Sequence, residues 1–138
     1  MKTCSEVDCK RLAVHLAERL GDELLAVYLY GSQALGEALA DSDIDLAVLC
    51  RHPLPPERRL DLALELADLA GRDVDLVDLR RVPTVLQFQI VSRGRRLLCR
   101  DETACELFET HVWSDYVALN EARAGILEDI RRRGCIYG

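Results

Sequence analysis

Two aspartates at the start of an apolar stretch, Asp43 and Asp45, have the spacing needed to bind a divalent cation. The stretch continues as Leu-Ala-Val-Leu, which predicts a β-strand, and residues two apart on a strand point to the same face of a sheet. Two carboxylates held so close repel each other unless a cation lies between them. Because the ligands are oxygens with no His or Cys beside them, the expected ion is Mg²⁺, which takes one or two carboxylates together with substrate phosphates.

Gly31 and Ser32, which ten residues separate from Asp43, have the features of a phosphate-binding turn. They follow the apolar run LLAVYLY, which predicts a buried strand over residues 24–30. Gly31 permits a tight turn with close backbone approach, and Ser32 can cap the short helix predicted after it. Free N–H groups at such a helix N-terminus bind anions. An anion site beside a metal site is what nucleotidyl transfer from a nucleoside triphosphate requires.

The order Gly-Ser, ten residues, Asp-x-Asp resembles the signature of the DNA-polymerase-β-like nucleotidyltransferases, and the segment SDIDLAVL in a short chain resembles their minimal branch. In that family a third aspartate on a later strand completes the metal site. The matching segment here is VDLVDL, residues 74–79, and the resemblance assigns the third position to Asp75. Two competitors stay open: Asp73, on the same strand face as Asp75, and Asp78, on the opposite face of a regular strand.

Minimal nucleotidyltransferases of this type are similar to antitoxins encoded beside HEPN-domain ribonuclease toxins. The resemblance implies a Mg²⁺-dependent enzyme that transfers AMP from ATP to a tyrosine hydroxyl of a cognate HEPN toxin, releasing pyrophosphate and silencing the toxin. It also implies that Asp43, Asp45 and Asp75 hold the metal and carry the catalysis, while Gly31 and Ser32 bind the nucleotide. Two alternatives stay open: a nucleotidyltransferase that modifies small molecules, and an antitoxin that acts by steric binding only.

The elements that position these residues follow from apolar patterns and turn residues. Helices are predicted over about 5–20, 56–70 and 83–92, and strands over 24–30, 43–49, 73–79 and 95–99. Ser5 is expected to cap the first helix, and Gly21, Gly71 and Gly94 to end the helices they follow. The helix over 56–70 carries leucines on more than one face, so we expect it to be well buried: Leu60, Leu62, Leu64, Leu66 and Leu69.

The predicted fold is α/β, with a small mixed β-sheet flanked by helices, as in the polymerase-β-like nucleotidyltransferases, and a long helical segment at the C-terminus. A chain of 138 residues, 49% of them hydrophobic, is expected to form one nucleotidyltransferase domain. Its catalytic core is predicted over about 1–100 and the C-terminal helical segment over about 102–134.

The C-terminal segment carries apolar side chains at steps of roughly 3.5 residues: Phe108, Val112, Tyr116, Leu119, Ile126 and Ile130. Arg123 and Gly125 interrupt this stripe and could mark a kink or a break. Two interpretations stay open, and both can hold for different halves of the segment. The stripe either packs against the domain's own sheet or projects and docks onto a partner, with Trp113 and Tyr116 as anchors.

Six cysteines show no paired spacing typical of a metal site, and we expect them to be reduced thiols: Cys4, Cys9, Cys50, Cys99, Cys105 and Cys135. The N-terminus lacks the apolar core of a signal peptide, and no apolar run approaches the ~20 residues of a membrane span. The predicted location is therefore the cytoplasm, with no membrane partner. The net charge of −6 argues against direct binding of nucleic acid.

Arginines gather around the strand predicted over 95–99: Arg80, Arg81, Arg93, Arg95, Arg96 and Arg100. One of them could reach a triphosphate or a phosphate of a partner, because arginine binds phosphate bidentately. A solvated basic face is the simpler interpretation, so these residues are left out of the predicted site.

Overall fold

A four-stranded sheet forms the centre of the computed structural model, which describes residues 6–31 and 43–137 and the side chains of 9–31 and 43–128. The strands are β1 (Leu24–Tyr30), β2 (Ile44–Cys50), β3 (Val74–Asp78) and β4 (Arg95–Cys99), in the spatial order β3-β2-β1-β4. β2 and β4 run antiparallel to β1, whereas β3 runs parallel to β2. The sheet is therefore mixed, as the sequence predicts.

The helices begin and end close to the predicted residues. They are α1 (Glu6–Leu20), the short 3₁₀ helix η1 (Gly21–Glu23), α3 (Pro56–Ala70), α4 (Thr84–Arg93) and α5 (Glu102–Tyr137). Gly71 ends α3 with a left-handed φ of 70°, which a residue without Cβ adopts at no steric cost. The predicted cap Ser5 and the short helix expected after Gly31 lie outside the described residues.

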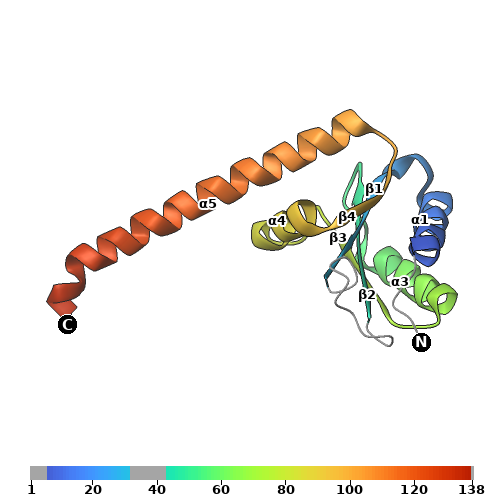
Figure 1. Ribbon diagram of the computed structural model, residues 1–138, viewed down its shortest axis with the longest axis horizontal. Helices are drawn as coiled ribbons and strands as arrows, with labels where there is room; N and C mark the ends of the chain where they lie inside the picture. The colour runs from blue at the N-terminus through green and yellow to red at the C-terminus, as the bar shows by residue number, and fades with distance from the viewer. Residues whose placement is uncertain (1–5, 32–42, 138) are drawn as a thin grey trace.

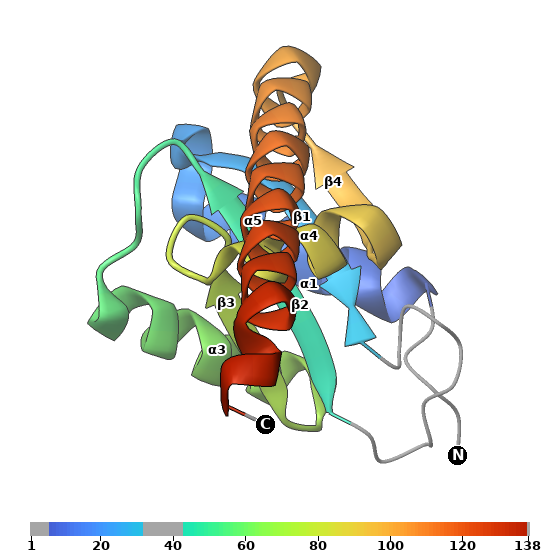
Figure 2. The ribbon, with the colours of Figure 1, turned by 90° about the vertical axis from the view of Figure 1, so that its left-hand side faces the viewer.

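Two layers of helices cover the sheet (Figures 1 and 2). α1 and α3 lie on one face, where Leu46 of β2 and Leu16 of α1 belong to the larger apolar core. α4 and the beginning of α5 lie on the other face, where Leu49 packs in a second core with Ile90 and Cys105. Alternate residues of β2 therefore enter different cores, and Ile44, Leu46 and Val48 point away from Asp45 into the larger one.

The prediction that α3 is buried on more than one face is wrong. Leu62 and Leu66 are fully buried, but Leu60, Leu64 and Leu69 expose between 42% and 59% of their surface. α3 packs on β3 and α1 along one stripe only, and nothing among the described residues covers its outer face. The prediction relied on the number of leucines in α3, and it overstated their burial because apolar side chains are also common on protein surfaces.

The long helix α5 is continuous, so Arg123 and Gly125 do not mark a break in it. A glycine inside a helix costs only about 1 kcal/mol relative to alanine, which is too little to interrupt thirty-six helical residues. The helix packs on α4, and Figure 1 shows it extending away from the body of the domain. Ile126 and Leu127, in the projecting half, are each 60% exposed.

The first half of α5 is fastened to the domain. The Tyr28 hydroxyl donates a hydrogen bond of 2.7 Å to Glu109 Oε2, and this contact joins β1 to α5. Phe88 of α4 stacks on Tyr116 at 3.7 Å between ring centroids and meets Trp113 edge-on at 4.6 Å. Trp113 and Tyr116, predicted as anchors for a partner, thus pack against their own domain. The first half therefore packs on the domain, as one interpretation has it, and the second half projects, while its docking onto a partner stays a prediction.

The cysteines in the described part of the chain are free thiols, as predicted: Cys9, Cys50, Cys99 and Cys105. Burial raises the pKa of Cys50 and that of Cys105 to about 12, so both remain protonated and act as small apolar side chains. None of the described helices is long and apolar enough to cross a membrane.

Candidate active site

Tyr30, Asp45 and Asp75 form a row across three neighbouring strands. The register of β1 with β2 places Tyr30 opposite Asp45, and the register of β2 with β3 places Asp45 opposite Asp75. Residues paired in this way lie about 5 Å apart and point to the same face of a sheet. The structure therefore brings together two carboxylates that are thirty residues apart in the sequence, on the sheet face that α4 covers.

The electrostatics of Asp45 show how close these groups are. Partial burial, followed by the negative charges of Asp75 and Asp43, raises the pKa of Asp45 above its usual range. Asp43 lies just before the first residue of β2 and is exposed. Each of the three carboxylates is described by the structure, and the ionised form of the central one is destabilised by the other two.

This donor set suits Mg²⁺, because a cation relieves the repulsion and all available ligands are oxygens. Within the described residues, no three Asp, Glu, His or Cys side chains form a group that could hold a metal ion by themselves. Magnesium sites in nucleotide enzymes commonly take only one or two carboxylates and complete their shell with water and substrate phosphates. The residues present fit that kind of site.

Gly31 directly follows β1 and cannot carry a side chain without disturbing Asp45. Its φ of 72° lies in the left-handed region, and a Cβ built there would overlap Oδ2 of Asp45. Both features suit the predicted tight turn, which itself lies largely outside the described residues, and the phosphate-binding role of Gly31 stays a prediction. Ser32 lies outside the described residues, so its phosphate-binding role stays a prediction.

Tyr30 is a member of the site that sequence reasoning missed. Its side chain is half-buried, and burial together with the charges of Asp75 and Asp45 raises its pKa well above the ordinary value. A neutral phenol therefore stands beside the carboxylates. The available signal was the alternation Tyr28-x-Tyr30 directly before Gly31, which places both tyrosines on one face of the strand.

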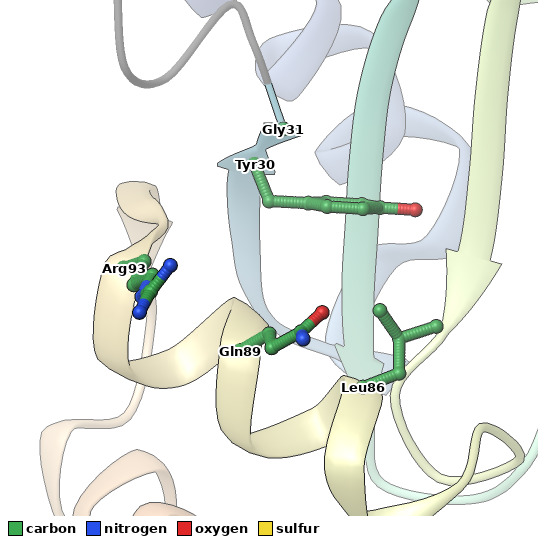
Figure 3. Close-up of a pocket in the computed structure, with 5 residues that line it drawn as sticks. All are labelled: Tyr30, Gly31, Leu86, Gln89 and Arg93. Atoms are coloured by element: carbon green, nitrogen blue, oxygen red, sulfur yellow. The ribbon is translucent and has the colours of Figure 1, made fainter.

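A cavity of about 290 Å³ opens beside this row. It is lined by Tyr30 and Gly31 at the end of β1 and by Leu86, Gln89 and Arg93 of α4. Figure 3 shows the three α4 side chains on the face of the helix that is turned toward Tyr30 and Gly31. The cavity is large enough for part of a nucleotide, since ligand pockets for whole small molecules range from roughly 300 to 1,000 Å³.

The two competitors for the third carboxylate have other surroundings. Asp78 is at the far end of β3 and is 2% exposed; its Oδ2 accepts a 2.7 Å hydrogen bond from Leu54 N and its Oδ1 one of 3.0 Å from Arg80 N. It fixes the loop before α3. Asp73 precedes β3, and its backbone carbonyl accepts a hydrogen bond from Ile44 N. Asp75 alone of the three is paired with Asp45.

Comparison with known proteins assigns the fold to a family. The family described as "Polymerase beta, Nucleotidyltransferase" matches residues 14–103, which contain the strands of the row and the turn at Gly31. The chain belongs to this family. It is a nucleotidyltransferase, and the resemblance stated from the sequence motif is confirmed.

Similar proteins include one relative matched by sequence and two matched by structure. Protein adenylyltransferase MntA of Shewanella oneidensis is 40% identical over 108 residues, which are 78% of this chain and 77% of the relative. A crystal structure described as a toxin-antitoxin with AMP-PNP has a TM-score of 0.77 at 36% identity, covering 88% of this chain and 98% of that chain. The MNT antitoxin in complex with the tri-AMPylated Shewanella oneidensis HEPN toxin has a TM-score of 0.74 at 33% identity, covering 92% and 99%.

Proposed function

We propose that this nucleotidyltransferase is an antitoxin that transfers AMP from ATP to a tyrosine hydroxyl of a cognate HEPN toxin in the cytoplasm. The observation that carries the proposal is the meeting of Asp45 and Asp75 beside the turn at Gly31. That arrangement occurs in a chain 40% identical to a protein adenylyltransferase, and solved relatives include an antitoxin bound to its AMPylated toxin.

Asp43, Asp45 and Asp75 are the candidate ligands of Mg²⁺, which would take one or two of these carboxylates together with substrate phosphates and would supply charge neutralisation of the triphosphate when bound. Gly31 leaves room for the substrate phosphates to approach the backbone, and Ser32 is proposed to donate to the same phosphates. The partly buried position of Asp45 excludes water from one side of the carboxylate and strengthens its electrostatic effect.

The reaction is a displacement at the α-phosphorus of ATP. The acceptor oxygen forms a bond to that phosphorus, the bond to the bridging α–β oxygen breaks, and pyrophosphate leaves. The phenolic proton passes to a carboxylate at the acceptor end of the row, for which we propose Asp75, or to water. Positioning and charge stabilisation account for most of the catalysis in phosphoryl transfer, so a small domain suffices.

A steric antitoxin is the second candidate, because α5 offers a contact surface that needs no chemistry. Its projecting half leaves Ile126 and Leu127 60% exposed. Apolar side chains at such a distance from the domain's own core suit a partner interface. The likeness to spectinomycin adenyltransferase AAD(9) of Enterococcus faecialis, at 14% identity and a TM-score of 0.55, concerns the fold alone.

The test is the intact mass of a co-expressed HEPN-type partner after incubation with the protein, ATP and Mg²⁺. We expect shifts by whole AMP units with the wild type and none with Asp43→Ala. The variant should still co-purify with the partner, because Asp43 is exposed and outside the packed core. An unchanged mass in a tight complex would establish the steric antitoxin instead. Neither binding nor a mass shift would overturn both candidates.

A further inference from the structure

Of the six arginines around β4, Arg93 is the one whose side chain makes no hydrogen bond or ion pair within the described residues. Arg95 is engaged in an interaction of its own. The guanidinium groups of the other four contact other parts of the fold. Three donate hydrogen bonds to backbone carbonyl oxygens: Arg80 to Cys50, Arg81 to Leu54 and Arg100 to Gly21. Arg96 forms ion pairs with Glu102 and Glu109. A solvated basic face was the simpler prediction for this group, and the structure instead gives most of its members structural partners.

Arg93 is exposed and lines the active-site cavity, where the packing of α4 on β1 places its backbone. It occupies the last turn of α4, and Gly94 follows it in close contact with the sheet. A Cβ built at Gly94 would overlap Ile90 O and lie 3.0 Å from Leu29 O, so the chain there rests directly on the backbone of β1. This contact brings the end of α4 to the end of β1, where Gly31 begins the turn.

Gln89 lies one helical turn before Arg93 on the same face, with Leu86 a further turn back (Figure 3). The Gln89 amide also makes no hydrogen bond within the part of the chain that the structure describes. A guanidinium and an amide with unused donors thus line one wall of the cavity, and Tyr30 and Gly31 line the other. A cation in the last turn of a helix also interacts favourably with the helix dipole. That effect would account for the position of Arg93, but it involves neither the cavity nor Gln89.

We propose that Arg93, assisted by Gln89, binds the polyphosphate of the nucleotide in the cavity beside Gly31. The inference rests on the proposed function, since it takes a nucleoside triphosphate as substrate. The carboxylates of Asp45 and Asp75 would repel a polyanion, and Mg²⁺ would offset only part of the charge of these two groups. A guanidinium donates two parallel hydrogen bonds to phosphate oxygens, and it does so from the wall opposite the row.

The test is equilibrium binding of ATP, inorganic tripolyphosphate and adenosine to the full chain with Mg²⁺ and without any acceptor, by isothermal titration calorimetry. For Arg93→Gln we expect the Kd for ATP and for tripolyphosphate to rise roughly tenfold or more, and that for adenosine to stay unchanged. Arg93→Lys should fall between, because lysine keeps the charge and loses the bidentate geometry. Arg123→Gln is the matched control, since it removes the same charge from an exposed position on α5.

Each outcome decides the inference. An unchanged Kd for ATP in Arg93→Gln would overturn it, as would an equal weakening of ATP and adenosine, which would assign the cavity to the nucleoside. An equal weakening of ATP binding in Arg123→Gln would show that the effect comes from net charge alone. That result would also overturn the inference. An Arg93-dependent affinity supports it even where no HEPN partner is modified, a result that would overturn only the proposed acceptor.

Discussion

Gly31→Ala is expected to abolish most of the activity while costing only modest stability. The substitution adds one methyl group at a left-handed φ of 72°, and that group would overlap Oδ2 of Asp45. The carboxylate must then rotate away from its place opposite Asp75, or the turn must move. Either change displaces a group that the reaction requires at a fixed position.

The expected magnitude has two parts, and Gly71 separates them. A residue with a Cβ pays about 1–2 kcal/mol for the left-handed conformation, and this cost applies equally at Gly31 and at Gly71, whose φ is 70°. A Cβ at Gly71 meets nothing within 4 Å, so Gly71→Ala reports the backbone cost alone. Displacement of a positioned group by about 1 Å lowers the rate roughly 100-fold, and we expect that loss only in Gly31→Ala.

The assay pairs urea unfolding, followed by the fluorescence of the single tryptophan, with initial rates of AMP transfer from labelled ATP. Both variants should lose similar stability, and only Gly31→Ala should lose transfer. Full transfer activity in Gly31→Ala would refute the close approach to Asp45. Equal loss of transfer in Gly71→Ala would show that the rate responds to general destabilisation.

Three further predictions concern the row and its supports. Asp45→Asn removes a carboxylate whose pKa is raised by burial and by Asp75, so without Mg²⁺ at neutral pH the Tm should rise. The difference from the wild type should shrink as the pH falls toward that pKa, and thermal scans that show the opposite trend would contradict the assignment. Asp75→Asn should abolish transfer without any loss of stability, since it relieves the same repulsion with Asp45. Asp78→Asn should keep transfer and cost about 1–3 kcal/mol, because an amide nitrogen replaces an acceptor of buried hydrogen bonds. Reversed results would make Asp78 the third carboxylate. Phe88→Ala removes two ring contacts worth about 0.5–1.5 kcal/mol each and should lower the free energy of unfolding accordingly. The tryptophan emission should shift to the red. An unchanged urea midpoint would mean that these contacts contribute nothing to stability.

The strands and most helices could be predicted because local signals for them agree. LLAVYLY and IDLAVLC are apolar runs bounded by polar or turn residues, and Gly71 and Gly94 mark helix ends that depend only on the backbone. Asp43 and Asp45 were candidates for the same reason, since their spacing on one strand is local. Asp75 needed the family resemblance, because its distance from Asp45 is set by the parallel pairing of β2 and β3.

The features that sequence reasoning missed depend on contacts between distant segments. Leu64 is apolar but faces away from the sheet, on a helix face that it shares with the exposed Asp61 and Asp68. Trp113 was read as an anchor for a partner because Phe88, which it meets, lies twenty-five residues away on another helix. Arg96 forms ion pairs with Glu102 and Glu109, whereas Arg93 has no ion pair within the described residues, and this difference is a property of tertiary structure.

The carboxylate row is held in place by the apolar residues on the opposite face of the same strands. Asp45 and Asp75 are flanked by the paired residues Ile44 and Val74 on one side and Leu46 and Leu76 on the other. A slip of one residue would turn the carboxylates into the core and these apolar side chains toward α4. Two charges about 5 Å apart at an effective dielectric constant of about 20 repel by roughly 3 kcal/mol.

The apolar side opposes that repulsion with a larger free energy. Ile44, Leu46 and Leu76 are at most 1% exposed, and burial of each such side chain contributes about 1.5–3 kcal/mol. Their sum, roughly 5–9 kcal/mol, exceeds the repulsion even before any cation is bound. The burial of these side chains therefore favours the register that keeps the two carboxylates side by side, even in the absence of Mg²⁺.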